Sequence, residues 1–366
     1  MHLILVLGTT LQGVPEARCL KVSSILNILS LRKETMIRRN ITRHYFYIGL
    51  ALLLLLVHWG SPLVAAGKPE RITVDYAYYN PVSLLLRDKK WLEEEFAADG
   101  IQIRWVQSLG SNKALEFLNS RSVDFGSTAG AAALLGRING NPVKSIYVYS
   151  KPEWTALVTA KDSGIQTVAD LKGKRVAATR GTDPHIFLIR ALADHGLTEK
   201  DLRVVLLQHQ DGRMALENGD VDAWAGLDPM MAQSELNKTV RLFYRNADLN
   251  TLGILNTREE FAEEHPDLVE RVLQVYERAR NYALAHPEEL RRIFALQAKQ
   301  TEAVAALQLG ERTDLSSAAL DAPKRKTIVE AGLALQQAGV IPANVNVIAS
   351  ADELIDTSFT AKLGIQ

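Results

Sequence analysis

The stretch Val123-Asp124-Phe125-Gly126-Ser127-Thr128-Ala129-Gly130-Ala131-Ala132 joins a short apolar strand to the start of an alanine-rich helix. Small hydroxyl and glycine residues form the junction. This layout predicts free backbone N–H groups and two hydroxyls at a helix N-terminus, where an anion is stabilised. A similar junction lies within residues 175–185. Two such turns on two lobes predict a cleft that closes on a small anionic ligand.

After Gly67 the chain alternates between strand-like and helix-like segments, which predicts an α/β protein. Apolar or alternating runs predict strands over 71–78, 101–106, 123–126, 143–149, 156–160, 175–178, 202–206 and 221–225. Caps and apolar spacing predict helices over 80–98, 111–120, 129–138, 183–195 and 212–218. Two more strand-like runs lie within 242–255, and the remainder is helical, with Pro266 and Pro287 marking helix starts.

The simplest architecture for this order is two α/β lobes with a cleft between them. We expect residues 67–158 and 249–366 to form the first lobe and residues 159–248 to form the second. The chain then crosses between lobes twice, near 158–161 and near 245–251. Two crossings between compact lobes suit closure on a ligand.

Composition excludes several classes of function. The 366 residues are 47% apolar and 23% charged, which is ordinary for a globular protein. The formal net charge is zero, but residues after 66 carry a net charge of −5, so nothing indicates nucleic-acid binding. The eight histidines lack metal-ligand spacing, and the single cysteine is Cys19. We therefore expect no metal and no cofactor.

Residues 1–66 have the layout of a leader. Arg38, Arg39 and Arg43 precede the apolar run 45–57, and small residues follow up to Ala66. This order is typical of a cleaved secretory signal, with cleavage after Ala66. The alternative is an uncleaved anchor, but the run is shorter than the roughly 20 residues that span a bilayer. A signal starting at Met36 has the usual length, so we expect translation to begin there, and a periplasmic product.

Several segments of the chain, taken in this order, resemble the solute-binding proteins of ABC importers for aliphatic sulfonates, with taurine and nitrate binders as wider relatives. The resemblance covers the chain after the leader and depends on residues 123–128, 168–177, 180–182 with 185, 219–224, 228–229 and 261–269. It implies a two-lobed periplasmic-binding-protein fold of the second type. It also implies a monomer that delivers a small organic anion, here a sulfonate, to a membrane permease and an ATPase.

The chain departs from this family at positions that face the ligand. Leu227 stands where a tryptophan is frequent, and Met230 stands where an aromatic residue is frequent. Ala129 or Gly130 stands where sulfonate binders often carry an acidic residue. The identity of the ligand is therefore less firmly predicted than the family.

A sulfonate needs hydrogen-bond donors. At the first turn, backbone N–H groups from Ser127 to Gly130 and the hydroxyls of Ser127 and Thr128 could supply them, with Ala129 between. The alternative is that both hydroxyls only cap the helix.

At the second turn, Gly181 and Thr182 could supply the remaining donors from the opposite lobe. Gly181 could instead serve only the turn. His185 is either a donor to the ligand or a solvated side chain. Arg180 pairs with the anion or with a surface carboxylate.

Other side chains are candidates for contact with the organic part of the ligand. Tyr79 and Asn80 follow the first strand, where ligands of open α/β sheets bind. Trp154 either lines the cleft or covers the hinge. Asp228 could accept a hydrogen bond from an amine or hydroxyl on the ligand, which would favour taurine-like molecules, or it could hold its own loop through an Asx turn.

Other classes of protein fit less well. The sequence Gly126-Ser127-Thr128-Ala129-Gly130 has threonine at the centre of what would be a nucleophile elbow, and no Walker A or zinc-protease motif is present. Pyrimidine-synthesis enzymes and binders of pyrimidine-like thiamine precursors share the expected fold, but the enzymes carry a cysteine-rich motif absent here. A sensor domain would need a DNA-binding or membrane partner segment. We expect a binding protein and not an enzyme.

Overall fold

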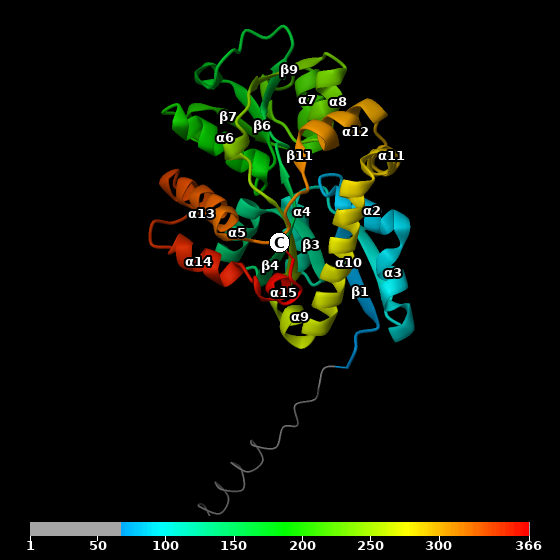
Figure 1. The fold of residues 1–366 in the computed structure, drawn as a ribbon. Helices are drawn as coiled ribbons and strands as arrows, with labels where there is room; N and C mark the ends of the chain where they lie inside the picture. Colours follow the sequence, from blue (N-terminus) through cyan, green and yellow to red (C-terminus); the bar gives the residue numbers. More distant parts are fainter. Residues whose placement is uncertain (1–66, 366) are drawn as a thin grey trace, which may run out of the picture. The chain divides into compact units, whose positions relative to one another are not determined.

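The computed structural model describes residues 67–365, which form two mixed β-sheets surrounded by helices (Figure 1). The predicted signal segment and the predicted start at Met36 lie outside the described residues. Within the described part, no helix is long and apolar enough to cross a membrane.

The first sheet has six strands and mixes parallel and antiparallel pairs. Its spatial order is β11 (Thr313–Asp314), β4 (Val143–Pro152), β10 (Gly253–Arg258), β3 (Phe125–Ala129), β1 (Arg71–Tyr76) and β2 (Gln102–Gln107). Strand β1 runs parallel to β2 and β3, whereas β10 runs antiparallel to β3 and β4. The carboxyl ends of β1, β2 and β3 therefore meet at one edge.

The second sheet has five strands. Its spatial order is β7 (Arg203–Leu206), β6 (Arg175–Ala178), β8 (Ala223–Ala225), β5 (Leu157–Ala160) and β9 (Val240–Tyr244). Strands β6, β7 and β8 are parallel, and β5 is antiparallel to β8 and β9. Two mixed sheets in two lobes confirm the predicted fold class.

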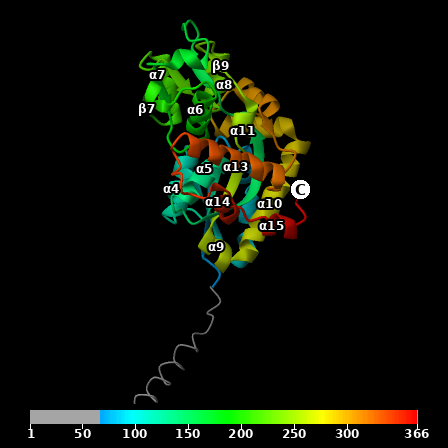
Figure 2. The ribbon, with the colours of Figure 1, turned by 90° about the vertical axis from the view of Figure 1, so that its left-hand side faces the viewer.

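Helices cover the first sheet on both faces. On one side lie α4 (Ser111–Asn119), α5 (Gly130–Ile138), α13 (Ala322–Gln337) and α14 (Val347–Leu354); Figure 2 shows α13 and α14 over α5. On the other side lie α2 (Pro81–Lys89), α3 (Trp91–Phe96) and α10 (Pro266–Ala285). The main hydrophobic core forms between these layers.

The remaining helices surround the second sheet or extend the tail. They are α6 (Asp183–Asp194), α7 (His209–Glu217), α8 (Met230–Leu236), α9 (Glu259–Glu264), α11 (Pro287–Gln297), α12 (Glu302–Ala306) and α15 (Ser358–Lys362). Helices α6, α7 and α8 pack on the second sheet. Helix α12 contacts α8, so the tail also reaches the second lobe.

Two segments connect the sheets, residues 153–156 between β4 and β5 and residues 245–252 between β9 and β10. They are hydrogen-bonded to each other, because the Thr155 N–H donates to Asn250 Oδ1 at 2.9 Å. The domain limits predicted from the sequence stay a prediction.

Most elements end within a few residues of their predicted limits, and three differences affect the architecture or the site. The helix expected over 80–98 is interrupted at Lys90, whose φ of 56° separates α2 from α3. The left-handed residue lets the buried Trp91 begin a new helix with its ring against Tyr282. Strand β3 extends to Ala129, and α7 begins at His209 instead of 212. The earlier start makes His209 the first residue of α7.

Candidate functional site

The two lobes enclose a pocket of about 470 Å³ between the carboxyl ends of their parallel strands. Its lining is Tyr78, Tyr79, Gln107, Ser108, Leu109, Gln208, His209, Gln210, Leu227, Asp228, Pro229, Met230, Gln233, Ala298, Lys299 and Gln300. These residues follow β1 and β2 in the first lobe, follow β7 and β8 in the second, and connect α11 to α12. Ligands of open α/β sheets bind at such strand ends.

Two helix N-termini, one from each lobe, meet beside this pocket. Helix α4 begins after Gly110 and α7 begins after Gln208, and neither helix has a side-chain cap. A Cβ atom built on Gly110 would lie 3.0 Å from Nε2 of His209, which places the two N-termini face to face. Uncapped N-termini offer free N–H groups and a partial positive charge, so this space suits an anion.

His209 is the first residue of α7 and is 2% exposed. Its Nδ1 lies 3.1 Å from the Thr179 hydroxyl oxygen, and that hydroxyl donates its proton to the Leu207 carbonyl at 2.7 Å. The hydroxyl must therefore accept from the ring, so Nδ1 carries the proton. Burial lowers the pKa of His209 to about 3, and the ring is neutral at physiological pH.

Several polar atoms at this site are buried and have no hydrogen-bond partner among the described residues. Those on lining side chains include Nε2 of His209, Oε1 of Gln208 and Oε1 of Gln300. Buried polar atoms are nearly always paired, so a cluster of unpaired ones around a pocket indicates a ligand or water site. Lys299, which is exposed and lies on the α11–α12 connection, adds a positive charge to the lining.

The turn expected to bind the anion in the first lobe is used internally. The Ala129 N–H donates to the Ser111 hydroxyl at 2.9 Å, and the Gly130 N–H donates to the Leu252 carbonyl at 2.9 Å. The Thr128 hydroxyl oxygen accepts from Asn256 Nδ2 at 2.8 Å. The N-terminus of α5 therefore has partners from the chain itself, and the expectation of free donors there is not met.

Ser127 and Asn80 belong to the same internal network. The Ser127 hydroxyl donates to Asp75 at 2.7 Å and accepts from Asn80 Nδ2 at 2.8 Å, and all three side chains are fully buried. Asn80 also caps α2 through its Oδ1. Burial raises the pKa of Asp75 to about 6, although hydrogen bonds from Ser127 oppose this. Neither Ser127 nor Asn80 lines the pocket, so both have structural roles here.

Tyr79 and Trp154 both border a small cavity beside the pocket. Tyr79 lines the pocket, and its hydroxyl donates to the Ser127 carbonyl at 2.9 Å. Its ring packs edge-on against Trp154, with ring centroids 5.9 Å apart. Trp154 Nε1 donates to Asp183 at 2.7 Å, so this side chain also holds the connection between lobes.

The second predicted turn faces the first lobe without lining the pocket. A Cβ atom on Gly181 would lie 3.8 Å from Cβ of Asn112 in α4. The φ of 76° at Gly181 serves the turn. Thr182 borders a small cavity with Tyr79 and Trp154, but its hydroxyl donates to the Thr179 carbonyl at 2.6 Å. The hydroxyl therefore has no free proton to donate to a ligand.

Asp183, which follows Thr182, holds both connections between the lobes. It accepts from Trp154 Nε1 in the first connection and from the N–H (2.9 Å) and hydroxyl (2.6 Å) of Thr251 in the second. Burial raises its pKa, whereas these hydrogen bonds lower it.

His185 and Arg180 line a different crevice, between α6 and the end of α13. His185 Nε2 lies 2.9 Å from a carboxylate oxygen of Glu199, which accounts for its polar contact without a ligand. The structure therefore does not bring His185 together with the other predicted residues.

Asp228 lines the pocket, but its carboxylate is occupied. Both oxygens lie 3.3 Å from Nη1 of Arg312, and Oδ1 accepts from the Ala232 N–H at 2.9 Å. Burial raises the pKa of Asp228 to about 6, although Arg312 opposes this. These contacts are structural, but they are not the predicted Asx turn, because the N–H that Asp228 binds is four residues on and not two.

Four residues at this site were not predicted from the sequence: Gly110, Gln208, His209 and Lys299. A signal for three of them was present: Gly110 follows the strand predicted over 101–106, and Gln208 and His209 follow the strand predicted over 202–206. Because parallel strands bring such positions to one edge, these residues could have been proposed. Lys299 had no such signal.

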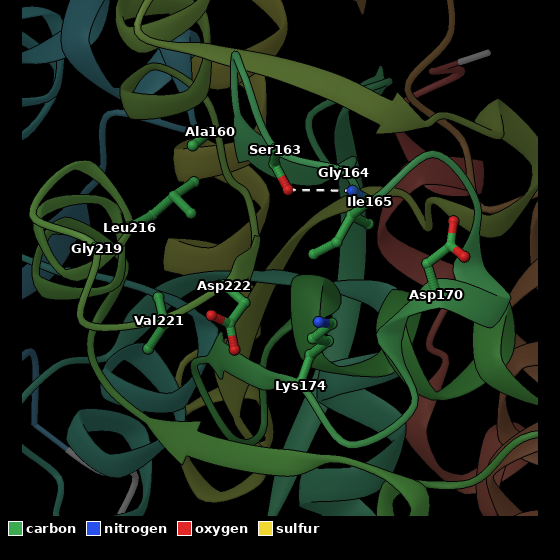
Figure 3. A pocket seen from close by; sticks show the side chains of 10 residues that line it. All are labelled: Ala160, Ser163, Gly164, Ile165, Asp170, Lys174, Leu216, Gly219, Val221 and Asp222. Atoms are coloured by element: carbon green, nitrogen blue, oxygen red, sulfur yellow. Dashed lines mark hydrogen bonds between the residues drawn. The ribbon is translucent and has the colours of Figure 1, made fainter.

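A second pocket, shown in Figure 3, lies at the opposite end of the second sheet. It borders the beginning of β6 and β8, and its acidic groups already have partners. Asp222 accepts from the Arg175 backbone N–H at 2.7 Å, and Asp170 accepts from the Thr167 N–H at 2.8 Å. The Ser163 hydroxyl accepts from the Ile165 N–H (dashed in Figure 3). This arrangement has no feature that recognises a ligand.

Within the described residues, no cluster of histidine and acidic side chains could hold a metal ion.

Comparisons with known proteins identify the family. The family described as NMT1/THI5 like matches residues 95–290. The Escherichia coli (strain K12) protein named "Putative aliphatic sulfonates-binding protein" is 32% identical over 234 residues, which are 63% of this chain and 73% of that protein. The alkanesulfonate-binding protein SsuA from Xanthomonas axonopodis pv. citri, solved bound to MOPS, is 25% identical with a TM-score of 0.71, and the match covers 80% of this chain and all of that one.

The family also includes an enzyme. The 4-amino-5-hydroxymethyl-2-methylpyrimidine phosphate synthase of Candida albicans (strain WO-1) is 25% identical over 213 residues, 53% of this chain and 61% of the synthase. The match to the Escherichia coli sulfonates-binding protein is stronger in both identity and coverage. The chain therefore belongs to the NMT1/THI5-like family and is a homologue of its aliphatic sulfonate-binding proteins.

Proposed function

We propose that this protein is the extracytoplasmic substrate-binding component of an ABC importer for a small organic sulfonate. The observation that carries the proposal is the pair of uncapped helix N-termini, α4 and α7, that meet across one pocket from opposite lobes. The Nε2 atom of His209 faces Gly110 beside this space, but as an acceptor it does not bind the sulfonate oxygens. These two N-termini take the place, as the proposed anion site, of the two turns that the sequence suggested.

The chemistry of the site fits a sulfonate. The head group is an anion with three acceptor oxygens, and the helix N-termini offer donors without a full charge. Each hydrogen bond to a charged acceptor contributes about 1.5–3 kcal/mol, so four of them support roughly micromolar binding after ordering costs. Lys299 adds long-range attraction at the pocket. Because the donors come from both lobes, opening would release the ligand.

Isothermal titration of the exported protein, expressed from the full chain, tests the ligand class. The panel contains ethanesulfonate, taurine, sulfate, nitrate and a hydroxymethylpyrimidine. We expect heat with the sulfonates. Heat with the pyrimidine alone would refute the anion site, and binding of nitrate or sulfate but no sulfonate would transfer the proposal to an inorganic anion.

The variant Gly110→Val tests the location of the site. The new side chain would start 3.0 Å from Nε2 of His209 and enter the space between the two N-termini. We expect sulfonate affinity to fall at least tenfold. The matched control is Gly164→Val, because a Cβ atom there meets nothing within 4 Å and lies far from the pocket lining. Equal affinities for the two variants would place the ligand elsewhere.

Delivery to an importer requires export. We propose that the segment before residue 67 directs the protein across the inner membrane, as its charged and apolar runs indicate. Cell fractionation and N-terminal sequencing of the product of the full chain would check this. A product that keeps its N-terminus and stays in the cytoplasm would contradict it.

A further inference from the structure

We propose that Nε2 of His209 accepts a hydrogen bond from a donor group on the bound sulfonate. The pocket then prefers sulfonates that carry an amine or a hydroxyl over unsubstituted alkanesulfonates of the same length. This inference rests on the proposed function, because it assigns a specificity-determining residue within the same site.

The hydrogen bonds of His209 determine which nitrogen of its imidazole ring carries the proton. The Thr179 hydroxyl gives its proton to the Leu207 carbonyl and so accepts from Nδ1 of His209. Only Nε2 then holds a free lone pair. That atom is buried without a partner among residues 67–365, and it points to Gly110 of the facing lobe. An acceptor of this kind is stabilised by a donor that the protein itself does not supply.

A protonated His209 ring would instead be a cation that binds the sulfonate directly. Burial lowers the pKa of His209 to about 3, so protonation at pH 7.5 requires a gain in proton affinity above ten-thousandfold. A unit negative charge about 4 Å away, at an effective dielectric constant of 20, supplies roughly a thousandfold. The ring therefore stays neutral and remains an acceptor.

Three charged groups near the pocket do not compete with His209 as an acceptor for the ligand. Asp228, after β8, is paired with Arg312 and is unavailable as an acceptor. Asp183, on α6, is occupied by Trp154 and Thr251. Lys299, on the α11–α12 connection, is a cation and offers no acceptor. The acceptor that the sequence suggested at Asp228 is thus provided by His209.

The test compares ligands of equal size in the exported protein at pH 7.5. Taurine and 2-hydroxyethanesulfonate each differ from propane-1-sulfonate by one terminal group. We expect taurine to bind about tenfold or more tightly than propane-1-sulfonate, and the hydroxy compound several-fold more tightly. In His209→Phe these ratios should fall to about one, whatever the change in the absolute affinity for propane-1-sulfonate. His209→Gln, which keeps an acceptor, should retain part of the preference.

Two further measurements test the role of Nε2 of His209 even if His209→Phe folds poorly. Thr179→Val removes the hydroxyl that fixes the proton on Nδ1, so the preference should shrink without any change in a lining residue. Nitrogen chemical shifts of the His209 ring should show a neutral imidazole with its proton on Nδ1, both free and with taurine bound. His195→Phe, an exposed position on the second lobe, is the control and should leave the ratios unchanged.

The outcomes separate the two proposals. Equal affinities for taurine and propane-1-sulfonate, or a preference that survives in His209→Phe, would overturn the role of His209 and leave the sulfonate function intact. A doubly protonated ring in the complex would also overturn it. Failure of every sulfonate to bind would refute the proposed function, and this inference with it.

Discussion

Breaking the buried ion pair between Arg312 and Asp228 by removing one partner should be costly, and the loss tests the electrostatics of the lobe contact. Arg312 lies just before β11, which pairs with the first sheet, whereas Asp228 follows β8 of the second sheet. The two side chains are 3% and 0% exposed, with Nη1 lying 3.3 Å from each carboxylate oxygen. Arg312 also contacts Glu235 on α8.

The expected magnitude follows from burial. Arg312→Met leaves the Asp228 carboxylate without a countercharge, and breaking a buried pair in this way costs about 3–5 kcal/mol. Glu235 is partly exposed, so its lost contact adds less than about 1 kcal/mol. Because burial already raises the pKa of Asp228 to about 6, the cost should be smaller at pH 5, where much of the carboxyl is neutral.

The assay is urea unfolding followed by tryptophan fluorescence at pH 7.5 and pH 5. The double variant Arg312→Met/Asp228→Asn removes the stranded charge and should recover more than half of the loss. Arg325→Met, which breaks the exposed pair with Asp352, is the matched control and should cost less than about 1 kcal/mol. A loss below 1 kcal/mol for Arg312→Met, or a double variant as unstable as the single one, would refute the reasoning.

Two further predictions concern the first sheet. Gly253→Ala should lower the free energy of unfolding by about 1–3 kcal/mol, because the added Cβ would lie 2.3 Å from Cε2 of Tyr149; a melting temperature equal to that of the unhindered Gly164→Ala would contradict this. Asp75 has a pKa raised by burial to about 6, so its folded carboxyl holds a proton more firmly than the unfolded one, and its stabilising contribution is lost as pH rises from about 4 to about 6. Relative to wild type, the free energy of unfolding of Asp75→Asn should therefore rise by up to roughly 3 kcal/mol between pH 4 and pH 7. A change of opposite sign in parallel urea titrations would show that the pKa of Asp75 is not raised.

The fold was largely predictable because it depends on local patterns. Strand and helix periodicity, together with caps such as Asn80, places the alternating elements along the chain. The break at Lys90 was not predictable, since it depends on packing between Trp91 and Tyr282, which are far apart in the sequence.

The site was less predictable for the same reason. The α5 N-terminus has the composition of an anion site, but Ser111 and Leu252, both distant in sequence, already accept from its N–H groups. The α4 and α7 N-termini have less suggestive sequences and remain uncapped. Whether a donor is free depends on tertiary contacts that local composition does not contain.

The hydrogen bond between Thr155 and Asn250 also constrains how the molecule can move. Two connections that did not contact each other would let the lobes twist and slide relative to each other as well as bend. Connections joined side by side resist twisting and sliding more than bending, so we expect the lobes to open and close mainly by rotation about one axis. The protein would then reach the same closed conformation whichever lobe the ligand contacts first. A membrane partner could recognise the ligand-bound state from that closed conformation alone.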